Sequence, residues 1–364
     1  GVSMDDLGYW LVFNRVMGIG PARLRALLQY FGDLRTAWEA DEGAWRAAGL
    51  DQRTIRNLAE ARRRLHPDRE REQLERSGVM AFTWEDPTYP LLLRRIPDPP
   101  PVLFVRGHLA EADRWALAIV GTRRPTAYGR QATEWFSGEL ARAGIPIVSG
   151  LARGIDAIAH EAALRAGGRT IAVLPCGVDR VYPLEHARLA ARILESGALV
   201  SELPLGAPAE PGNFPARNRL ISGLAVGVLV VEAGAASGAL ITASHAAEQG
   251  REVFAIPGSV FSPASQGTNR LIRDGATPVT SPQELLEALN WSTAAQQVEA
   301  QLQLPADPIE ARLLEVLSRE PQHIDDIARA AGLPVAQVSS ALTMMELKGM
   351  ARHLGAMHYV RGSC

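Results

Sequence analysis

The chain has 364 residues, of which 47% are hydrophobic and 21% are charged, so it can bury a core and is not a disordered protein. The length predicts two or three domains. A formal net charge of −2 excludes a histone-like polycation, so any anion-binding surface must be local.

The cysteine content and the first residues predict a cytoplasmic protein. Cys176 and Cys364 are too few for a disulfide scaffold or a cysteine metal cluster, which fits a reducing compartment. Residues 1–6 lack the basic and apolar regions of a signal peptide. The most apolar stretch, 224–243, is interrupted by Glu232, so we expect no membrane span and no membrane partner.

Residues 4–80 are predicted to form an all-helical domain of the helix-hairpin-helix or SAM-like type. Apolar residues recur at helical spacing on both sides of a break at residues 17–21. Gly18 and Gly20 in that break would join two helices and expose N–H groups to a phosphate. Asp51 is expected to cap a helix that runs to Arg64.

A proline-rich connector is expected over residues 86–112. Because proline lacks an N–H group and clashes inside a helix, we predict no helix there. The apolar residues 102–105 are compatible with one short strand.

Residues 81–290 are predicted to form an α/β domain with a Rossmann-like parallel sheet. Short apolar runs alternate with amphipathic helices, and an unbroken apolar run is typical of a strand buried on both faces. The expected strands cover residues 116–120, 146–149, 170–174, 199–201, 227–231, 252–256 and 277–280.

Residues 291–307 are predicted to be a linker, and residues 308–364 a winged helix. The expected hairpin of 351–354 and 357–360 turns at Gly355-Ala356, after three helices at 309–318, from 324, and at 334–348. Acidic and basic residues balance in this domain, and its third helix has almost no side chain that could contact bases. We therefore expect it to contact protein rather than to read a duplex.

The first group of candidate binding residues follows the first predicted strand, and open α/β sheets bind ligands at that end of their strands. Gly121 lets the backbone approach a ligand, and Thr122 precedes the start of a helix with exposed N–H groups. Arg123 adds a planar fork that suits a phosphate. This turn alone is a weak signal, since it is also compatible with an ordinary strand-to-helix connection.

A second turn of the same kind follows the second strand. It contains Ser149, Gly150 and Arg153, so that two turns on neighbouring strands would form one anion-binding crevice. Gly154 is expected to serve helix–strand packing. Asp156 is expected to fix the turn or cap the helix rather than to act as an acid catalyst.

A third group stands at 213–220, where an aromatic residue precedes two arginines. Phe214 would either stack on a base or pack in the core. Arg217 and Arg219 flank Asn218 and point to different sides of a helix, so one of the two arginines is available for a structural ion pair.

A fourth group follows the most apolar strand, where Ser237, Gly238 and Thr242 could hold a further phosphate. No dinucleotide, P-loop or nucleophile-elbow motif occurs, and the histidines form no metal-binding pattern, so we predict neither a cofactor nor a metal. Cys176 has no base beside it in sequence and is expected to be a buried small residue.

The ordered series of these motifs resembles the DprA/Smf family of bacterial DNA-processing proteins. The matching segments are 121–123, 149–156, 170–174, 214–219, 237–242, 256–258, 267–269 and 274–276. The resemblance covers residues 80–285 most strongly. The helical and winged-helix flanks also look like those of longer members.

The resemblance implies a non-enzymatic protein that binds single-stranded DNA in the Rossmann-like crevice. It further implies protection of incoming DNA, dimerisation through that domain, and help in loading the recombinase RecA during natural transformation and recombination. By motif, Arg123 would hold phosphate, Phe214 would meet a base, and Arg217, Asn218 and Arg219 would line the pocket. Residues 281–289 are a candidate dimer surface.

Two departures from the family pattern stand near this pocket. Residues 210–213 contain no lysine ahead of Phe214, and His186 occupies a position where asparagine is usual. The rival hypothesis is a nucleotide-processing hydrolase of the phosphoribohydrolase type on the same sheet. Such enzymes carry a P-G-G-x-G-T stretch with a nearby glutamate, which residues 232–237 do not match.

Overall fold

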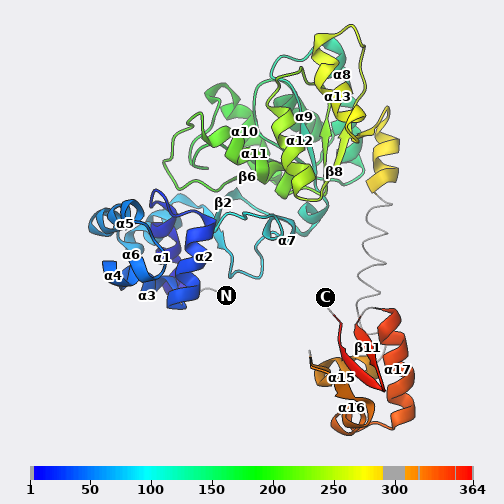
Figure 1. Cartoon of the computed structure of the whole chain (residues 1–364). Helices are drawn as coiled ribbons and strands as arrows, with labels where there is room; N and C mark the ends of the chain where they lie inside the picture. Colours follow the sequence, from blue (N-terminus) through cyan, green and yellow to red (C-terminus); the bar gives the residue numbers. More distant parts are fainter. Residues whose placement is uncertain (1–3, 290–307, 319, 349, 363–364) are drawn as a thin grey trace. The chain divides into compact units, whose positions relative to one another are not determined.

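The computed structural model describes residues 4–289, 308–318, 320–348 and 350–362. The chain divides into two compact units, Gly1–Leu286 and Glu287–Cys364 (Figure 1). Across the described ranges, the search for an apolar helix of bilayer-spanning length finds none.

Residues up to Ser77 are all helical, as predicted, and aspartates begin three of the helices. Asp33, Asp41 and Asp51 each accept a hydrogen bond from the backbone N–H three residues later, at 2.7–2.8 Å, which confirms the expected cap at Asp51. The helices are α1 (Met4–Asn14), α2 (Pro21–Phe31), α3 (Leu34–Glu39), α4 (Glu42–Ala47), α5 (Gln52–Arg64) and α6 (Pro67–Ser77).

These helices share a core with one edge of the sheet. Trp10 of α1 packs edge-to-face on Trp84 with ring centroids 6.0 Å apart, and Phe104 of β2 belongs to the same apolar cluster. Asn14 also donates a hydrogen bond to the carbonyl of Glu202 at 3.2 Å. The helical region is therefore part of the larger unit.

A nine-stranded sheet forms the centre of the larger unit, in the order β1-β2-β6-β5-β4-β3-β7-β8-β9. The seven strands from β6 to β9 in this order are parallel, and β1 and β2 add an antiparallel edge. The strands are β1 (Met80–Thr83), β2 (Val102–Gly107), β3 (Leu117–Val120), β4 (Ile147–Ser149), β5 (Thr170–Val173), β6 (Ala198–Ser201), β7 (Gly227–Val230), β8 (Glu252–Ala255) and β9 (Thr277–Pro278).

All seven predicted parallel strands are present in the structure. Helices cover both faces of the sheet (Figure 1), as the unbroken apolar runs predicted. Alternate residues of β5 show this: Ala172 packs towards α9 and α10, and Val173 packs towards α11 and α12. The sequence analysis missed β1, an edge strand with only one fully buried residue, although residues 79–82 form a short apolar run. The helices are α8 (Ala127–Arg142), α9 (Ile155–Arg165), α10 (Ala187–Ser196), α11 (Asn213–Gly223), α12 (Ala239–Glu248) and α13 (Gln266–Arg273).

One expectation about the flanks of the sheet was wrong. A one-turn helix, α7 (Leu91–Arg94), interrupts the connector, because Pro90 stands at its N-cap, where its missing N–H costs nothing. The residues 281–289 remain a predicted dimer surface, in which Leu285 is buried and residues 283, 284 and 287 are exposed.

The smaller unit is a winged helix, as predicted. Its elements are α15 (Pro308–Val316), β10 (Gln322–His323), α16 (Ile324–Ala331), α17 (Val335–Leu347), β11 (Ala351–Gly355) and β12 (His358–Arg361). The hairpin turns at Ala356-Met357, both at positive φ, one residue later than predicted. Lys348, the one lysine of the chain, pairs with buried Glu310 at 2.7 Å. The predicted linker 291–307 lies outside the described residues.

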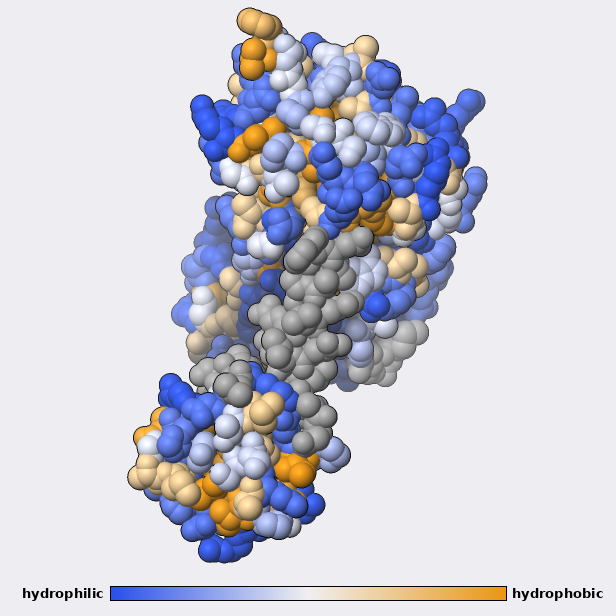
Figure 2. Space-filling model, turned by 90° about the vertical axis from the view of Figure 1, so that its right-hand side faces the viewer, coloured by the Kyte–Doolittle hydropathy of each residue, from blue (hydrophilic) through white to orange (hydrophobic). Residues whose placement is uncertain are grey.

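Hydrophilic residues cover most of the face drawn in Figure 2, with hydrophobic side chains gathered on a projection at the top of the larger unit. Among the most exposed apolar side chains of the chain are Val260 and Phe261, which are 80% and 93% exposed in the loop that follows β8. This loop is therefore a candidate surface for contact with another molecule.

Candidate functional site

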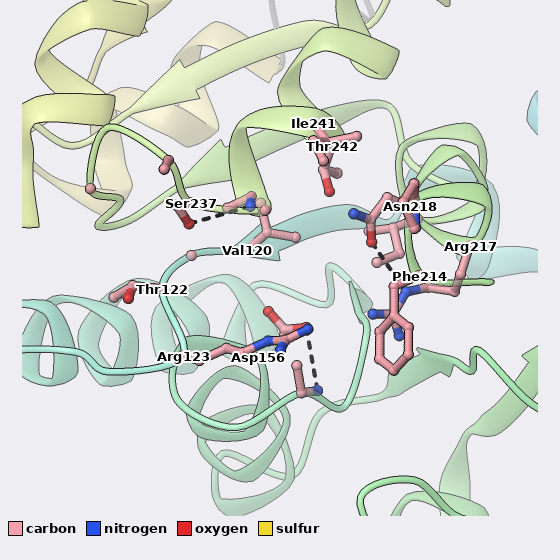
Figure 3. Close-up of a pocket in the computed structure, with 18 of the residues that line it drawn as sticks. Val120, Thr122, Arg123, Asp156, Phe214, Arg217, Asn218, Ser237, Ile241 and Thr242 are labelled. Atoms are coloured by element: carbon pink, nitrogen blue, oxygen red, sulfur yellow. Dashed lines mark hydrogen bonds between the residues drawn. The ribbon is translucent and has the colours of Figure 1, made fainter. Parts of the chain in front are cut away.

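A cleft of about 590 Å³ opens at the carboxyl ends of the central parallel strands (Figure 3). It lies between the turn after β3, the first turns of α11 and the segment that leads into α12. The predicted site residues that line it are Gly121, Thr122, Arg123, Phe214, Arg217, Asn218, Ser237, Gly238 and Thr242. A small extension of about 20 Å³ adds Gly150 and Arg153 to this set.

The turn after β3 requires glycine at its first position. A Cβ on Gly121 would lie 2.6 Å from Cγ1 of Ile155 and 2.9 Å from the carbonyl oxygen of Glu232. The N–H of Thr122 donates to the same carbonyl at 2.8 Å, which fixes the turn against β7. The next side chain, Arg123, is exposed at the mouth of the cleft.

Phe214 lies between two guanidinium groups. The Cζ atoms of Arg123 and Arg217 lie 5.6 and 5.7 Å from its ring centroid. The ring is half-buried and faces the cleft, as Figure 3 shows. The structure therefore favours the stacking alternative for Phe214 over the core alternative.

Arg217 is buried and holds the strand ends together. Its Nη1 donates to the carbonyl oxygens of Gly150 and Val173 at 2.7 and 2.8 Å, and its Nε donates to Asn218 at 3.2 Å. Burial lowers the pKa of Arg217 to about 10, so the side chain stays charged at neutral pH. It contributes positive charge to the cleft while acting as a backbone clamp.

Arg219 was wrongly placed in the binding site. Its guanidinium lies on the opposite side of α11, where it pairs with Glu202 at 2.7 Å and with Asp98 at 2.9 Å. Two helical residues that are two positions apart do not share a face, so only one of the two arginines could line the cleft. Arg219 is the structural ion pair that the spacing allowed for.

Ser149 was also wrongly placed. It is fully buried, and its Oγ donates to the carbonyl of Ile119 at 2.6 Å, which links β4 to β3. Ser149 is the last residue of β4, and its side chain bonds to the neighbouring strand. The turn that lines the cleft begins at Gly150.

The turn after β4 is held by Asp156, as expected. One carboxylate oxygen accepts the N–H groups of Gly150 at 3.1 Å and Ala152 at 3.4 Å, and burial raises the pKa of this carboxyl. Gly154 serves packing, because at φ +82° a Cβ there would lie 2.5 Å from the carbonyl oxygen of Thr122.

Two histidines that sequence reasoning did not place in the site also hold this turn. Leu151, at a left-handed φ of 56°, donates its N–H to Nε2 of His160 at 3.3 Å and accepts from Nδ1 of His186 at 2.7 Å. Burial lowers the pKa of His160 to about 3, so its Nε2 is a neutral acceptor. The sequence signal for this contact was His186, which occupies a position where asparagine is usual in the family.

Tyr182 is a further residue that the sequence analysis missed. Its ring packs edge-to-face on Phe214, with centroids 5.4 Å apart and an interplanar angle of 77°. Both rings line the small extension of the cleft. Nearby, Arg153 forms a bidentate ion pair with Glu185 at 2.5 and 3.3 Å.

Small residues form the wall opposite Phe214. Gly234, Ala236, Ser237 and Gly238 line the cleft there, and Ser237 Oγ accepts the N–H of Ala239 at 3.3 Å, at the start of α12. Thr242 lines the cleft from the next turn but is almost fully buried. This wall leaves room for a flat ligand group next to the aromatic ring.

The glutamate at the end of β7 is occupied by a structural role. Glu232 is buried, and its two oxygens accept the N–H and the hydroxyl of Thr126 at 2.8 and 2.6 Å, at the N-cap of α8. The charged residues that line the main cleft are Arg123, Arg124, Arg217 and Asp156. The net charge of this lining is positive.

Neither cysteine nor metal chemistry gains support from the described part of the chain. Cys176 is buried, as expected, and burial raises the pKa of its thiol to about 11. Within the described ranges, no three side chains of His, Cys, Asp or Glu are grouped so that they could hold a metal ion.

Comparison with protein families gives two matches. The model of DNA recombination-mediator protein A matches residues 80–290, and the model of the DprA winged helix domain matches residues 297–357. Protein Smf of Synechocystis sp. is 36% identical over 99% of this chain and all of that protein. Protein Smf of Escherichia coli is 41% identical over 90% of this chain and 91% of that protein.

Two solved structures are similar in both fold and sequence. DNA processing protein A from Streptococcus pneumoniae has a TM-score of 0.67 and 35% identity, over 77% of this chain and 97% of that one. A structure from Helicobacter pylori, which describes the single-stranded DNA binding mode of its DNA processing protein A, has a TM-score of 0.53 and 33% identity. It covers 59% of this chain and 98% of that one.

Proposed function

Because the chain belongs to the DNA recombination-mediator protein A family, we propose that it binds single-stranded DNA in the cleft at the carboxyl end of its parallel sheet. The arrangement of Arg123, Phe214 and Arg217 is the observation that supports this proposal best. A strand without a partner offers phosphates and open base faces side by side, and these are the groups that arginines and an aromatic ring bind.

Charge and shape both favour a single strand over a duplex. The positive side chains line a recess rather than a protruding helix, and Phe214 lines the same recess. In a duplex the bases are already stacked and paired, so their faces could not meet the ring.

We propose a binding protein rather than an enzyme. A hydrolase of the phosphoribohydrolase type would need a carboxylate available to the substrate near the end of β7. Both oxygens of Glu232 are engaged by Thr126, and buried Asp156 accepts two backbone N–H groups. These engagements argue against the hydrolase alternative.

Within the cell, the proposed role is to protect incoming single-stranded DNA in the cytoplasm and to help load RecA during natural transformation and recombination. Family membership supports this role. We further propose a homodimer formed through the Rossmann-like domain. The exposed Val260 and Phe261 are the best candidates for the contact, because apolar surface of this kind marks interfaces.

Binding of labelled single-stranded and blunt duplex DNA, measured by fluorescence anisotropy over a range of salt concentrations, tests the proposed function. We expect much tighter binding of the single strand, with a log–log salt slope of about −0.7 per phosphate contacted. Equal affinity for the duplex would contradict the proposal. A parallel assay for nucleotide hydrolysis tests the enzyme alternative, and light scattering of the Phe261→Ser variant tests the dimer.

A further inference from the structure

We propose that Tyr182 is a second base-stacking residue beside Phe214, so that two consecutive bases of a bound strand are separated from one another. This inference rests on the proposed function, because it needs a single strand in the cleft. It assigns the exposed surface of Tyr182, at the edge of the cleft extension, to the base that follows the one on Phe214.

The first observation is the exposure of the Tyr182 ring. The residue is 40% exposed although its ring packs edge-to-face on Phe214. Bases stack on such open aromatic surfaces in proteins that bind single strands without reading sequence.

The second observation is that the loop carrying Tyr182 is held in place on both sides. Before the tyrosine, the carboxylate of Asp179 accepts the N–H of Gly206 at 2.9 and 3.0 Å. After it, Nδ1 of His186 donates to the carbonyl of Leu151 at 2.7 Å. The ring is therefore positioned before a ligand arrives, which lowers the entropy cost of binding.

The third observation is the charge around the two rings. The extension of the cleft is lined by Tyr182 and Phe214 together with Arg123, Arg153 and Arg217. In a nucleic acid strand each base is joined to the next through a phosphate, so aromatic surfaces need cations beside them. This combination matches a dinucleotide unit of a single strand.

The angle between the rings adds a consequence for sequence preference. Stacked neighbouring bases are parallel, whereas the two rings are 77° apart, so neighbouring bases can cover both rings only after their own stack is broken. Runs of adenine stack strongly and runs of thymine weakly, and preferences of this kind arise from stacking strength. We expect the protein to bind oligo-dT more tightly than oligo-dA of equal length.

The test compares the full-length protein with its Tyr182→Ala, Tyr182→Phe, Tyr182→Leu and Phe214→Ala variants, with anisotropy of labelled oligo-dT and oligo-dA as the readout. Tyr182→Ala should weaken oligo-dT binding at least about fivefold. It should also reduce the preference for oligo-dT over oligo-dA. Tyr182→Phe should bind like the wild type, and Tyr182→Leu should lose affinity like alanine, because leucine keeps bulk but has no π-face.

Tyr128→Ala is the matched control, since Tyr128 is an exposed tyrosine of α8 that does not line the main cleft or its extension. Unchanged melting temperatures would show that all variants fold. If Tyr182→Ala binds like the wild type while Phe214→Ala is weak, the second stacking residue is excluded but the proposed function stands. If Tyr182→Leu binds like the wild type, Tyr182 only supports Phe214 and the inference is wrong. A wild type that binds neither oligonucleotide would overturn the proposed function itself.

Discussion

Helix α11 carries an arginine on each of two sides, and the two arginines have different surroundings. On one side, Arg217 and its neighbour Phe214 line the cleft. On the other side, Arg219 forms ion pairs with Glu202 and Asp98 and does not line the cleft. The comparison teaches that an arginine in a binding motif can contact a ligand only if it does not already form an ion pair with a carboxylate of the fold. Substitutions on each side should therefore separate stability from binding.

The largest effect is expected on the structural side. Arg219→Ala leaves the mostly buried Glu202 without its partner and should lower the free energy of unfolding of the larger unit by about 3 kcal/mol. Urea unfolding followed by tryptophan fluorescence reports mainly this unit, because six of the seven tryptophans of the chain belong to it and only Trp291 does not. The folded variant should bind single-stranded DNA with nearly unchanged affinity. A stable variant with weak binding would reverse the assignment of the two sides.

On the cleft side, Arg123→Ala should act on binding alone. Losing a hydrogen bond to a charged phosphate should cost about 1.5–3 kcal/mol of binding free energy. The salt slope should become shallower by about 0.7, because one phosphate contact is lost. Arg142→Ala is the matched control, since Arg142 lies at the far end of α8 and pairs with Glu139. If both variants bind like the wild type, Arg123 is not the phosphate contact.

Substitutions of Phe214 test base stacking separately from charge, because they leave the arginines of the cleft in place. Phe214→Ala should cost about 1–3 kcal/mol of binding free energy at an unchanged salt slope. Phe214→Tyr should be nearly neutral in both binding and melting temperature, because the half-buried ring faces the cleft and the hydroxyl can reach water. A large fall in the melting temperature of Phe214→Tyr would instead place the ring in the core.

The smallest effect is expected at the Arg153–Glu185 pair, in which a carboxylate engages an exposed arginine of the cleft extension. Glu185→Gln should strengthen binding of single-stranded DNA slightly, because Arg153 is then available to a phosphate. Since both side chains are more than half exposed, the melting temperature should hardly change. Anisotropy at low salt is the sensitive measurement, and weaker binding would mean that the pair itself positions the site.

The site could be predicted from the sequence only as far as local geometry reaches. Gly121, Arg123, Ser237 and Gly238 follow strand ends, and the rule that ligands bind at the carboxyl ends of parallel strands brings them together. Ser149 failed although its strand end was predicted correctly, because the sequence does not reveal that its hydroxyl bonds to the carbonyl of Ile119 on the neighbouring strand. Tyr182 was missed because its contact with Phe214 joins a loop to the first turn of α11, far away in the chain.

By itself the sequence determined the order of elements: the capped N-terminal helices, the seven parallel strands and the winged helix. Periodicity, caps and unbroken apolar runs are local properties, so they are visible in the chain. Only the tertiary structure decided that Arg217 lines the cleft, that Arg219 pairs with Glu202 and Asp98, and that α1 shares its core with β2. These outcomes depend on contacts between residues that are far apart in the chain, and a local sequence pattern does not show which of them meet.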